Sequence, residues 1–329
     1  MTGPAGPVAA VRVALRRTLT EATLPADPLL LVACSGGADS LALAAATAFV
    51  APRAGMRAGL VTVDHGLQEG SARRAADVVA WASSEGFSPA AVVTVDITPH
   101  GEGPEAAARE ARYRGLADAA RDAGADAVLL GHTRDDQAET VLLALARGGG
   151  LRGIAGMAPA RSIDGVLFLR PLLDVARAQT RAACRALGLV PWEDPHNTDP
   201  AYTRSRVRTA LPLLADLLGD GVVANLARTA RLAAADLAVL DSMALSALED
   251  AATGDGGLRV EALAAMHPAI RGRVLRAYAL GLGTPPGALS ATHIEAMDAL
   301  ISGWHGQGPV ALPGGRRVAR AKGRIDVRE

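Results

Sequence analysis

A short glycine-containing segment near the start of the chain constrains its fold more than any other feature. Residues 33–40 read Ala-Cys-Ser-Gly-Gly-Ala-Asp-Ser, between the apolar run 29–32 and a stretch rich in alanine and leucine. The pattern predicts a buried strand, a glycine turn and the first turn of a helix. Glycine lets the backbone approach a ligand closely, and the free N–H groups at a helix N-terminus bind anions. The segment therefore predicts a phosphate-binding loop.

This loop differs from the nucleotide-binding loop of kinases and GTPases. No lysine follows the glycines, and the acidic residue Asp39 lies inside the turn. A carboxylate among phosphates is expected to hold Mg²⁺, which binds one or two carboxylates together with phosphate oxygens. We therefore expect Asp39 to be a magnesium ligand. The alternative is an ordinary glycine turn, which a lone Gly-Gly pair would indicate.

Short apolar runs alternate with helix-like stretches over the first part of the chain. Such alternation is typical of a parallel sheet with helices on both faces, so we predict an α/β fold with a Rossmann-like sheet. The carboxyl ends of its strands form one rim, where ligands bind. That rim would bring together Ser35–Ser40, Asp64-His65 and Gly131-His132. The expected strands are 29–34, 57–64, 90–95, 127–131 and 166–169, and the expected helices are 39–50, 71–85, 105–122, 135–146 and 175–187.

The last third of the chain follows another pattern. Helical periodicity replaces the strand pattern after Leu214, with helices expected near 222–250, 260–280 and 291–302. Residues 309–327 alternate apolar and polar side chains around a Pro-Gly-Gly turn, which is typical of a hairpin or small meander. We therefore predict two domains: residues 1–218, with the phosphate loop, and residues 219–329, a smaller, mainly helical domain that ends in a short β hairpin.

Composition limits the cofactors and the compartment. The only cysteines, Cys34 and Cys184, form no CxxC pair, so neither a zinc ribbon nor an iron–sulfur cluster nor a disulfide framework is expected. No apolar stretch approaches the roughly 20 residues that cross a bilayer, so we expect a cytoplasmic protein with no membrane partner.

The basic N-terminal residues are expected to form an amphipathic helix that packs on the first domain. Residues 200–329 carry 15 basic against 12 acidic residues, which favours this part for contact with an RNA backbone.

Further motifs follow the phosphate loop in order. They are Val63-Asp64-His65-Gly66-Leu67, Arg109-Glu110-Ala111-Arg112-Tyr113, the run GHTRDDQAET at 131–140, Arg170-Pro171-Leu172-Leu173, and the run YTRSRVR at 202–208. The phosphate loop resembles the pyrophosphate loop of the N-type ATP pyrophosphatases. The whole series resembles the tRNA(Ile)-lysidine synthetases over residues 30 to about 214.

The resemblance implies a specific reaction. It is the ATP-dependent ligation of free L-lysine to carbon 2 of the wobble cytidine in the CAU anticodon of tRNA(Ile). An adenylated tRNA is the intermediate, AMP and pyrophosphate are released, and decoding changes from AUG to AUA. The implied cofactors are ATP and Mg²⁺, and the C-terminal domain is expected to contact tRNA. A homodimer is compatible with the sequence, which does not set the oligomeric state.

The resemblance also implies roles for individual residues. Asp39, His132, Asp136 and Glu139 would be catalytic, and Asp136 and Glu139 would bind the lysine ammonium together with Arg208. The residues expected to bind ATP are Ser35, Gly36, Gly37, Ala38, Asp39, Ser40, Asp64 and His65. The residues expected to bind tRNA are Arg109, Arg112, Arg204, Arg206, Arg316 and Arg317.

Several of these residues also allow a purely structural interpretation. Asp136 and Glu139 share one face of the expected helix, and acidic residues near a helix N-terminus can act on the helix dipole alone. Asp135 can simply cap that helix. His132 can contact a phosphate or the target base, or make a structural hydrogen bond.

Two arginines and two aromatic residues also allow both a functional and a structural interpretation. Arg109 and Arg112 can reach phosphates or remain solvated. Tyr113 and Trp192 can stack on a base or anchor a core.

Three other functions compete with lysidine formation. A tRNA thiolase on the same scaffold would need reactive or cluster-binding cysteines. A metabolite-level ATP pyrophosphatase would usually bring a glutaminase domain or an ammonia channel. A nucleotide-sensing module would bind ATP without turnover, and it would not need two carboxylates at the rim.

Overall fold

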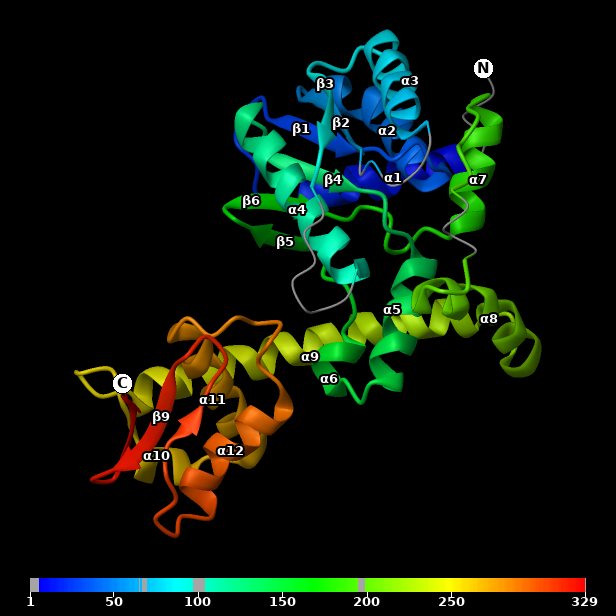
Figure 1. The fold of residues 1–329 in the computed structure, drawn as a ribbon. Helices are drawn as coiled ribbons and strands as arrows, with labels where there is room; N and C mark the ends of the chain where they lie inside the picture. Colours follow the sequence, from blue (N-terminus) through cyan, green and yellow to red (C-terminus); the bar gives the residue numbers. More distant parts are fainter. Residues whose placement is uncertain (1–5, 65, 67–69, 97–103, 195–198, 329) are drawn as a thin grey trace. The chain divides into compact units, whose positions relative to one another are not determined.

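The computed structural model describes residues 6–64, 66, 70–96, 104–194 and 199–328. The chain forms two compact units, residues 1–234 and 235–329 (Figure 1). The long helix α9 (Val222–Ala251) begins in the first unit and ends in the second.

The first unit is built on a six-stranded sheet with the order β3-β2-β1-β4-β6-β5. All neighbouring strands run parallel except β5, which is antiparallel to β6. The expected parallel sheet is confirmed, and all five expected strands end within one residue of their expected limits. The strands are β1 (Leu29–Ala33), β2 (Arg57–Asp64), β3 (Ala90–Thr94), β4 (Ala127–Leu130), β5 (Ala160–Ile163) and β6 (Val166–Leu169).

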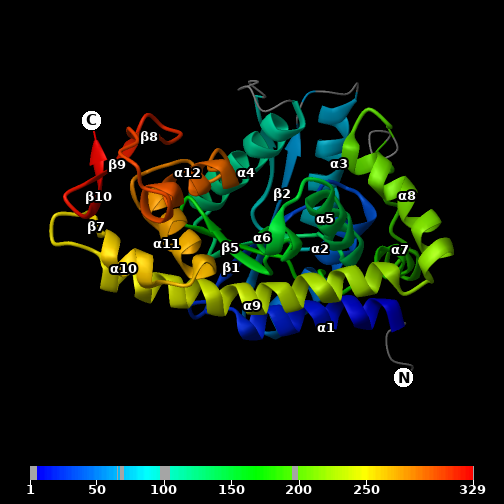
Figure 2. The same ribbon diagram turned by 90° about the horizontal axis from the view of Figure 1, so that it is seen from below.

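Alternate side chains of the strands form a core on each face of the sheet, because successive residues of a strand point to opposite sides. Leu30, Val32 and Leu60 belong to the core on one face, and Leu31 and Val61 belong to the other. The first face is covered by α1 (Gly6–Glu21), α2 (Ala38–Arg53), α3 (Ser71–Ser84) and α7 (Arg177–Ala186), and the second by α4 (Pro104–Asp122) (Figures 1 and 2).

Helix α1 is amphipathic, as expected from the N-terminal sequence. It buries Val8, Val11 and Leu15 in the core and packs against α2 and α7. Because α2 and α7 also carry residues of the candidate active site, packing of α1 against them helps to hold that site in position.

Strand β5 was not predicted. A two-residue turn, Asp164-Gly165, joins β5 to β6, and its φ angles are 49° and 79°. Positive φ at both positions is required by the tight hairpin turn that Asp-Gly favours. The hairpin signal was therefore present in the sequence, although β5 itself is largely exposed and lacks a run of buried residues.

Three further helices complete the first unit: α5 (Arg134–Ala146), α6 (Gly150–Ile154) and α8 (Thr203–Leu218). Helix α8 was not predicted and contains the arginine-rich run at 202–208. Within the described ranges no single helix is long and apolar enough to cross a membrane. Helices α8 and α9, bent by 102° between them, pass that test only as a pair, by length and composition.

The second unit combines helices with a small antiparallel sheet of order β7-β10-β9-β8. The helix expected over 260–280 is two helices, because Pro268 begins a new helix and the His267 side chain accepts a hydrogen bond from the Ala269 N–H (3.2 Å). The expected hairpin is part of the four-stranded sheet. The elements are β7 (Leu258–Arg259), α10 (Val260–Ala265), α11 (Pro268–Gly281), α12 (Ala291–Ser302), β8 (Val310–Ala311), β9 (Arg317–Ala321) and β10 (Arg324–Arg328).

Candidate active site

The phosphate loop joins β1 to α2 with the strand, turn and helix expected from the sequence. Ser40 Oγ accepts a hydrogen bond from the Ser35 N–H (3.1 Å) and donates one to the Gly37 carbonyl (3.0 Å). Gly36 has a φ of 78°, in the region that favours glycine. Gly37 is the N-cap of α2, and no side chain caps this helix. The first-turn N–H groups are therefore available to an anionic ligand.

Gly131 lets the end of β4 pass directly against this loop. A Cβ at this position would lie 3.0 Å from Ser40 N and 3.1 Å from the Asp39 carbonyl carbon, both of them backbone atoms. Any larger residue would have to displace the loop backbone by a few tenths of an ångström. Gly131 begins the motif at 131–140, but the sequence alone does not reveal this contact.

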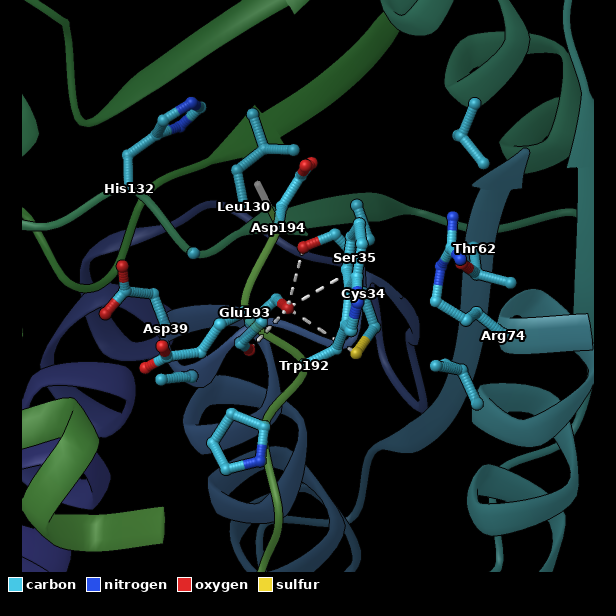
Figure 3. Close-up of a pocket in the computed structure, with 18 of the residues that line it drawn as sticks. Cys34, Ser35, Asp39, Thr62, Arg74, Leu130, His132, Trp192, Glu193 and Asp194 are labelled. Carbon is cyan, nitrogen blue, oxygen red and sulfur yellow. Dashed lines mark hydrogen bonds between the residues drawn. The ribbon is translucent and has the colours of Figure 1, made fainter. Parts of the chain in front are cut away.

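A pocket of about 740 Å³ opens at the carboxyl ends of β1, β2 and β4. In Figure 3, Asp39 and His132 lie on one side of the pocket, and Thr62 and Arg74 lie on the opposite side. Of the residues expected at the site, those that line the pocket are Ser35, Gly37, Ala38, Asp39, Ser40, Asp64, Arg112, His132, Asp136 and Arg208. Those outside its lining are Gly36, Arg109, Glu139, Arg204 and Arg206, with Arg316 and Arg317 in the second unit, and His65 lies outside the described residues.

Asp39 lies at the first turn of α2 and faces this pocket. Thr180 of α7 donates a hydrogen bond to Asp39 Oδ1, and Arg177 Nε lies 3.6 Å from Oδ2. Burial raises the pKa of Asp39 to about 6, and the charge of Asp136 adds to this, although Thr180 and Arg177 oppose it. The free helix N–H groups beside it suit phosphate oxygens, and a carboxylate next to phosphate oxygens can hold a divalent cation.

Asp136 lies in the first turn of α5 and forms a capping box with Thr133. Its Oδ2 accepts hydrogen bonds from the Thr133 N–H (2.8 Å) and Oγ1 (2.7 Å). Oδ1 accepts from Arg177 Nη2 (2.8 Å) and Arg208 Nη2 (3.3 Å). Burial alone would raise the pKa of Asp136, but the Arg177 charge and the Thr133 N–H hold it at about 2. Asp136 therefore stays ionised in neutral solution.

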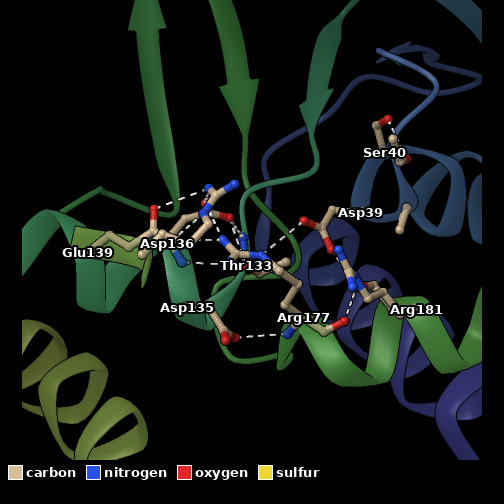
Figure 4. Close-up of polar contacts among 12 residues, drawn as sticks. Asp39, Ser40, Thr133, Asp135, Asp136, Glu139, Arg177 and Arg181 are labelled. Atoms are coloured by element: carbon tan, nitrogen blue, oxygen red, sulfur yellow. Dashed lines mark hydrogen bonds and ion pairs between the residues drawn. The ribbon is translucent and has the colours of Figure 1, made fainter. Parts of the chain in front are cut away.

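Glu139 is completely buried one turn further along α5, surrounded by arginines (Figure 4). Its Oε1 accepts hydrogen bonds from Arg177 Nη2 (3.0 Å) and Arg208 Nε (2.8 Å), and its Oε2 lies 3.3 Å from Arg204 Nε. Arg204 also donates to Thr140 Oγ1 (2.7 Å). Glu139 thus holds three guanidinium groups in place from behind the pocket.

Arg177 was not singled out from the sequence, because no motif marks α7. Its Nη2 contacts Asp136 and Glu139, its Nε approaches Asp39, and its backbone N–H donates to Asp135 Oδ2 (2.8 Å). The contacts with α5 join residues 38 to 42 positions apart, and the contact with Asp39 reaches a third helix, α2. Sequence spacing could not have revealed them.

His132 follows β4, is half-buried, and lines the pocket. Its Nδ1 is buried and has no hydrogen-bond partner among the described residues. Burial lowers the pKa of His132 to about 3, and the charges of Arg112, Arg170 and Arg109 add to this, although Asp136 opposes it. The imidazole is therefore neutral at physiological pH and offers one unsatisfied nitrogen.

The two aromatic residues that the sequence left open have different environments. Tyr113 is buried, packs against Phe168 with ring centroids 5.5 Å apart, and accepts a hydrogen bond from Arg170 (3.2 Å). Trp192 lines the pocket, with the Arg74 guanidinium 4.3 Å from its ring centroid. The backbone N–H of Trp192 donates a hydrogen bond to the Gly36 carbonyl (3.0 Å), which connects this segment to the phosphate loop. Tyr113 therefore belongs to the core, and Trp192 belongs to the lining of the pocket.

The chain also matches known protein families over most of its length. A family model described as a PP-loop domain matches residues 11–214, and one described as a TilS substrate binding domain matches residues 258–325. The tRNA(Ile)-lysidine synthase of Salinispora arenicola is 63% identical over 328 residues, covering 99% of this chain and 98% of its own length. The chain belongs to the tRNA(Ile)-lysidine synthase family.

Other relatives in this family extend over the whole chain as well. The tRNA(Ile)-lysidine synthases of Thermobifida fusca and Streptomyces coelicolor are 55% and 51% identical, and each comparison covers 99% of both chains. Among solved structures, the U34-tRNA thiolase NcsA from Methanococcus maripaludis with its 4Fe–4S cluster has a TM-score of 0.57 at 18% identity, covering 69% of this chain and 80% of that one. This likeness shows that the two proteins share a fold.

Proposed function

We propose that the chain catalyses ATP-dependent attachment of L-lysine to carbon 2 of the wobble cytidine in the CAU anticodon of tRNA(Ile). The carbonyl oxygen at carbon 2 is first adenylated, which releases pyrophosphate. The neutral lysine ε-amine then attacks carbon 2, forming the new carbon–nitrogen bond; AMP leaves with that oxygen, and the attacking nitrogen gives up a proton to solvent. The observation that carries the proposal is that the phosphate loop and Asp136 line one pocket and are joined through Arg177.

The phosphate loop supplies the ATP side of this reaction. Ser35, Ser40 and the backbone N–H groups at the start of α2 would bind the phosphates, since no side chain caps that helix. Asp39 would hold Mg²⁺, which when bound neutralises charge on the phosphates. Asp64 and Trp192 line the pocket beside the loop, where the nucleoside would bind.

The carboxylates of α5 supply the lysine side. Asp136 lines the pocket and stays ionised, so it would hold the lysine ammonium. Its low pKa suits a fixed negative charge better than a proton acceptor. Glu139 lies behind it and would act by fixing Arg208 and Arg177, and Arg208 lines the pocket within reach of a lysine carboxylate.

The target base and the tRNA would meet the remaining residues. His132 offers an unsatisfied neutral imidazole nitrogen inside the pocket, and Arg112 lines the same wall. Both are suited to a flipped-out base and its phosphate. Arg109, Arg204 and Arg206 would act more indirectly, because they lie outside the pocket lining. Every role assigned here falls on one copy of the chain.

Separate assays of the two half-reactions test the proposal. With labelled ATP and labelled lysine, Asp39→Asn should lose both tRNA adenylation and lysine transfer, because an amide cannot replace an anionic Mg²⁺ ligand. Asp136→Asn should still adenylate tRNA(Ile) but transfer little lysine. The matched control is Asp174→Asn, an exposed aspartate paired with Arg17 on the surface, which should do both.

Three results would contradict the proposal. Wild-type protein that transfers no lysine to tRNA(Ile) would exclude the reaction itself. An Asp136→Asn variant that loses adenylation and transfer together would assign Asp136 to ATP. Incorporation of sulfur in place of lysine would favour the thiolase alternative, although Cys34 and Cys184 are both buried.

A further inference from the structure

The guanidinium of Arg177 contacts carboxylates from two different helices. Nη2 donates to Asp136 Oδ1 (2.8 Å) and Glu139 Oε1 (3.0 Å) on α5, while Nε lies 3.6 Å from Asp39 Oδ2 on α2 (Figure 4). The backbone of Arg177 is fixed by Asp135, whose Oδ2 accepts from its N–H (2.8 Å). A fixed backbone with a long side chain allows the guanidinium to change partners without movement of α7.

The charge around Asp136 is unfavourable for a cationic ligand while Arg177 is in this position. Asp39, Asp136 and Glu139 supply three negative charges, and Arg177, Arg204 and Arg208 supply three positive charges in contact with them. A lysine ammonium would therefore meet a cluster with no net negative charge, and Asp136 Oδ1 already accepts two hydrogen bonds. Withdrawal of the Arg177 guanidinium leaves a net negative charge on the cluster and frees part of Asp136.

Bound ATP provides a competing partner for this guanidinium. Arg177 lines the pocket beside the phosphate loop. ATP with Mg²⁺ keeps a net negative charge, and a guanidinium binds phosphate through two parallel hydrogen bonds. We propose that Arg177 is a positioning residue that couples the two substrates: it occupies Asp136 until the phosphates of bound ATP withdraw it, and Asp136 then accepts the lysine ammonium. This inference rests on the proposed function.

Calorimetric titration of L-lysine tests the coupling directly. The protein is titrated with and without α,β-methylene-ATP and Mg²⁺, in the presence of an unmodified tRNA(Ile) transcript in both cases. The nucleotide should tighten lysine binding about tenfold or more, within the usual range of coupling between sites. By reciprocity, lysine should tighten binding of the nucleotide by the same factor.

Variants of Arg177 separate this role from a structural one. In Arg177→Met, lysine should bind without nucleotide nearly as well as with it, so the coupling factor approaches one. Arg181→Met is the matched control, because Arg181 lies on the same helix and lines the pocket but pairs with Glu193, 3.6 Å away. It should keep the wild-type factor. If the Arg177→Met variant does not fold, Arg177→Lys takes its place, because lysine keeps the positive charge. The coupling factor of Arg177→Lys should be smaller than that of the wild type.

Failure of the coupling and failure of the proposed function give different results in these titrations. If wild-type protein binds lysine equally with and without nucleotide, the coupling is refuted and the proposed function stands. If lysine binds in neither condition, the lysine site itself is refuted. Loss of lysine binding in both conditions for Arg177→Met, or an unchanged factor for Arg177→Lys, would also overturn the role assigned to Arg177.

Discussion

Replacement of Glu139 by glutamine should destabilise the first unit strongly. Glu139 is 0% exposed and lies within 2.8 to 3.3 Å of nitrogens from Arg177, Arg204 and Arg208. With Asp39 and Asp136, it balances these three guanidinium groups, so the Glu139→Gln variant leaves one buried positive charge unpaired. Loss of one partner from a buried ion pair costs about 3–5 kcal/mol. We expect the lower end, about 3 kcal/mol, because Asp136 still contacts Arg177 and Arg208.

Thermal unfolding measures this effect. For a unit of this size, 1 kcal/mol corresponds to about 2–4 °C, so the midpoint should fall by about 6–12 °C. The control is Asp174→Asn, whose carboxylate pairs with Arg17 and is 55% exposed. Surface pairs contribute about 0–1 kcal/mol, so this variant should shift the midpoint by a few degrees at most.

A double variant sharpens the test. Because Arg204→Gln removes one positive charge from the same cluster, the Glu139→Gln, Arg204→Gln pair should be less destabilised than the sum of the two single variants. If Glu139→Gln unfolds at the same temperature as Asp174→Asn, or if the double variant is strictly additive, the charge balance of this cluster does not stabilise the fold. The interpretation of Glu139 as the residue that fixes the arginines would then be wrong.

Three other predictions address the loop, the histidine and the C-terminal arginines. Gly131→Ala should weaken ATP binding at least tenfold in a nucleotide titration, because its Cβ would lie 3.0 Å from Ser40 N; unchanged binding would show that the loop yields freely. Between pH 6.5 and pH 3, His132 is neutral in the folded state and protonated in the unfolded state. Because the unfolded state then binds more protons, folding stability falls as the pH falls. Relative to His132→Asn, wild-type protein should therefore lose about 2 kcal/mol between pH 7 and pH 5 in urea unfolding, and a constant difference would refute the low pKa. Arg316→Ala with Arg317→Ala should weaken tRNA binding and make its salt dependence shallower by about two counterions, whereas equal salt slopes would exclude both arginines from the RNA contact.

The sequence was sufficient where structure depends on local patterns. The limits of β2 and β6 were predicted correctly, because short apolar runs bounded by turns define them. The phosphate loop was recognised for the same reason, since its serine, glycine and aspartate residues are contiguous. Pro268 and the Asp164-Gly165 turn are local signals of the same kind, the first for a helix start and the second for a hairpin.

The charge cluster could not be predicted in the same way. The sequence placed Asp136 and Glu139 on one helix face, which holds, but it gave no sign that Glu139 is buried behind the pocket. That burial depends on Arg177 and Arg208, which come from separate helices and meet Glu139 only in the folded sheet. Pairings of this kind are set by tertiary packing, so spacing within a motif does not reveal them.

The position of Trp192 gives the protein an intrinsic optical signal for its own ligands. The chain has three tryptophans: Trp81 packs near Phe87, Trp304 belongs to the second unit, and Trp192 alone among them lines the pocket. Its indole lies under the Arg74 guanidinium, and its backbone N–H is hydrogen-bonded to the phosphate loop. Binding of a nucleotide there would change the polarity and quenching around this one fluorophore. Emission from a variant that retains only Trp192 would thus report occupancy of the pocket in real time, without a label.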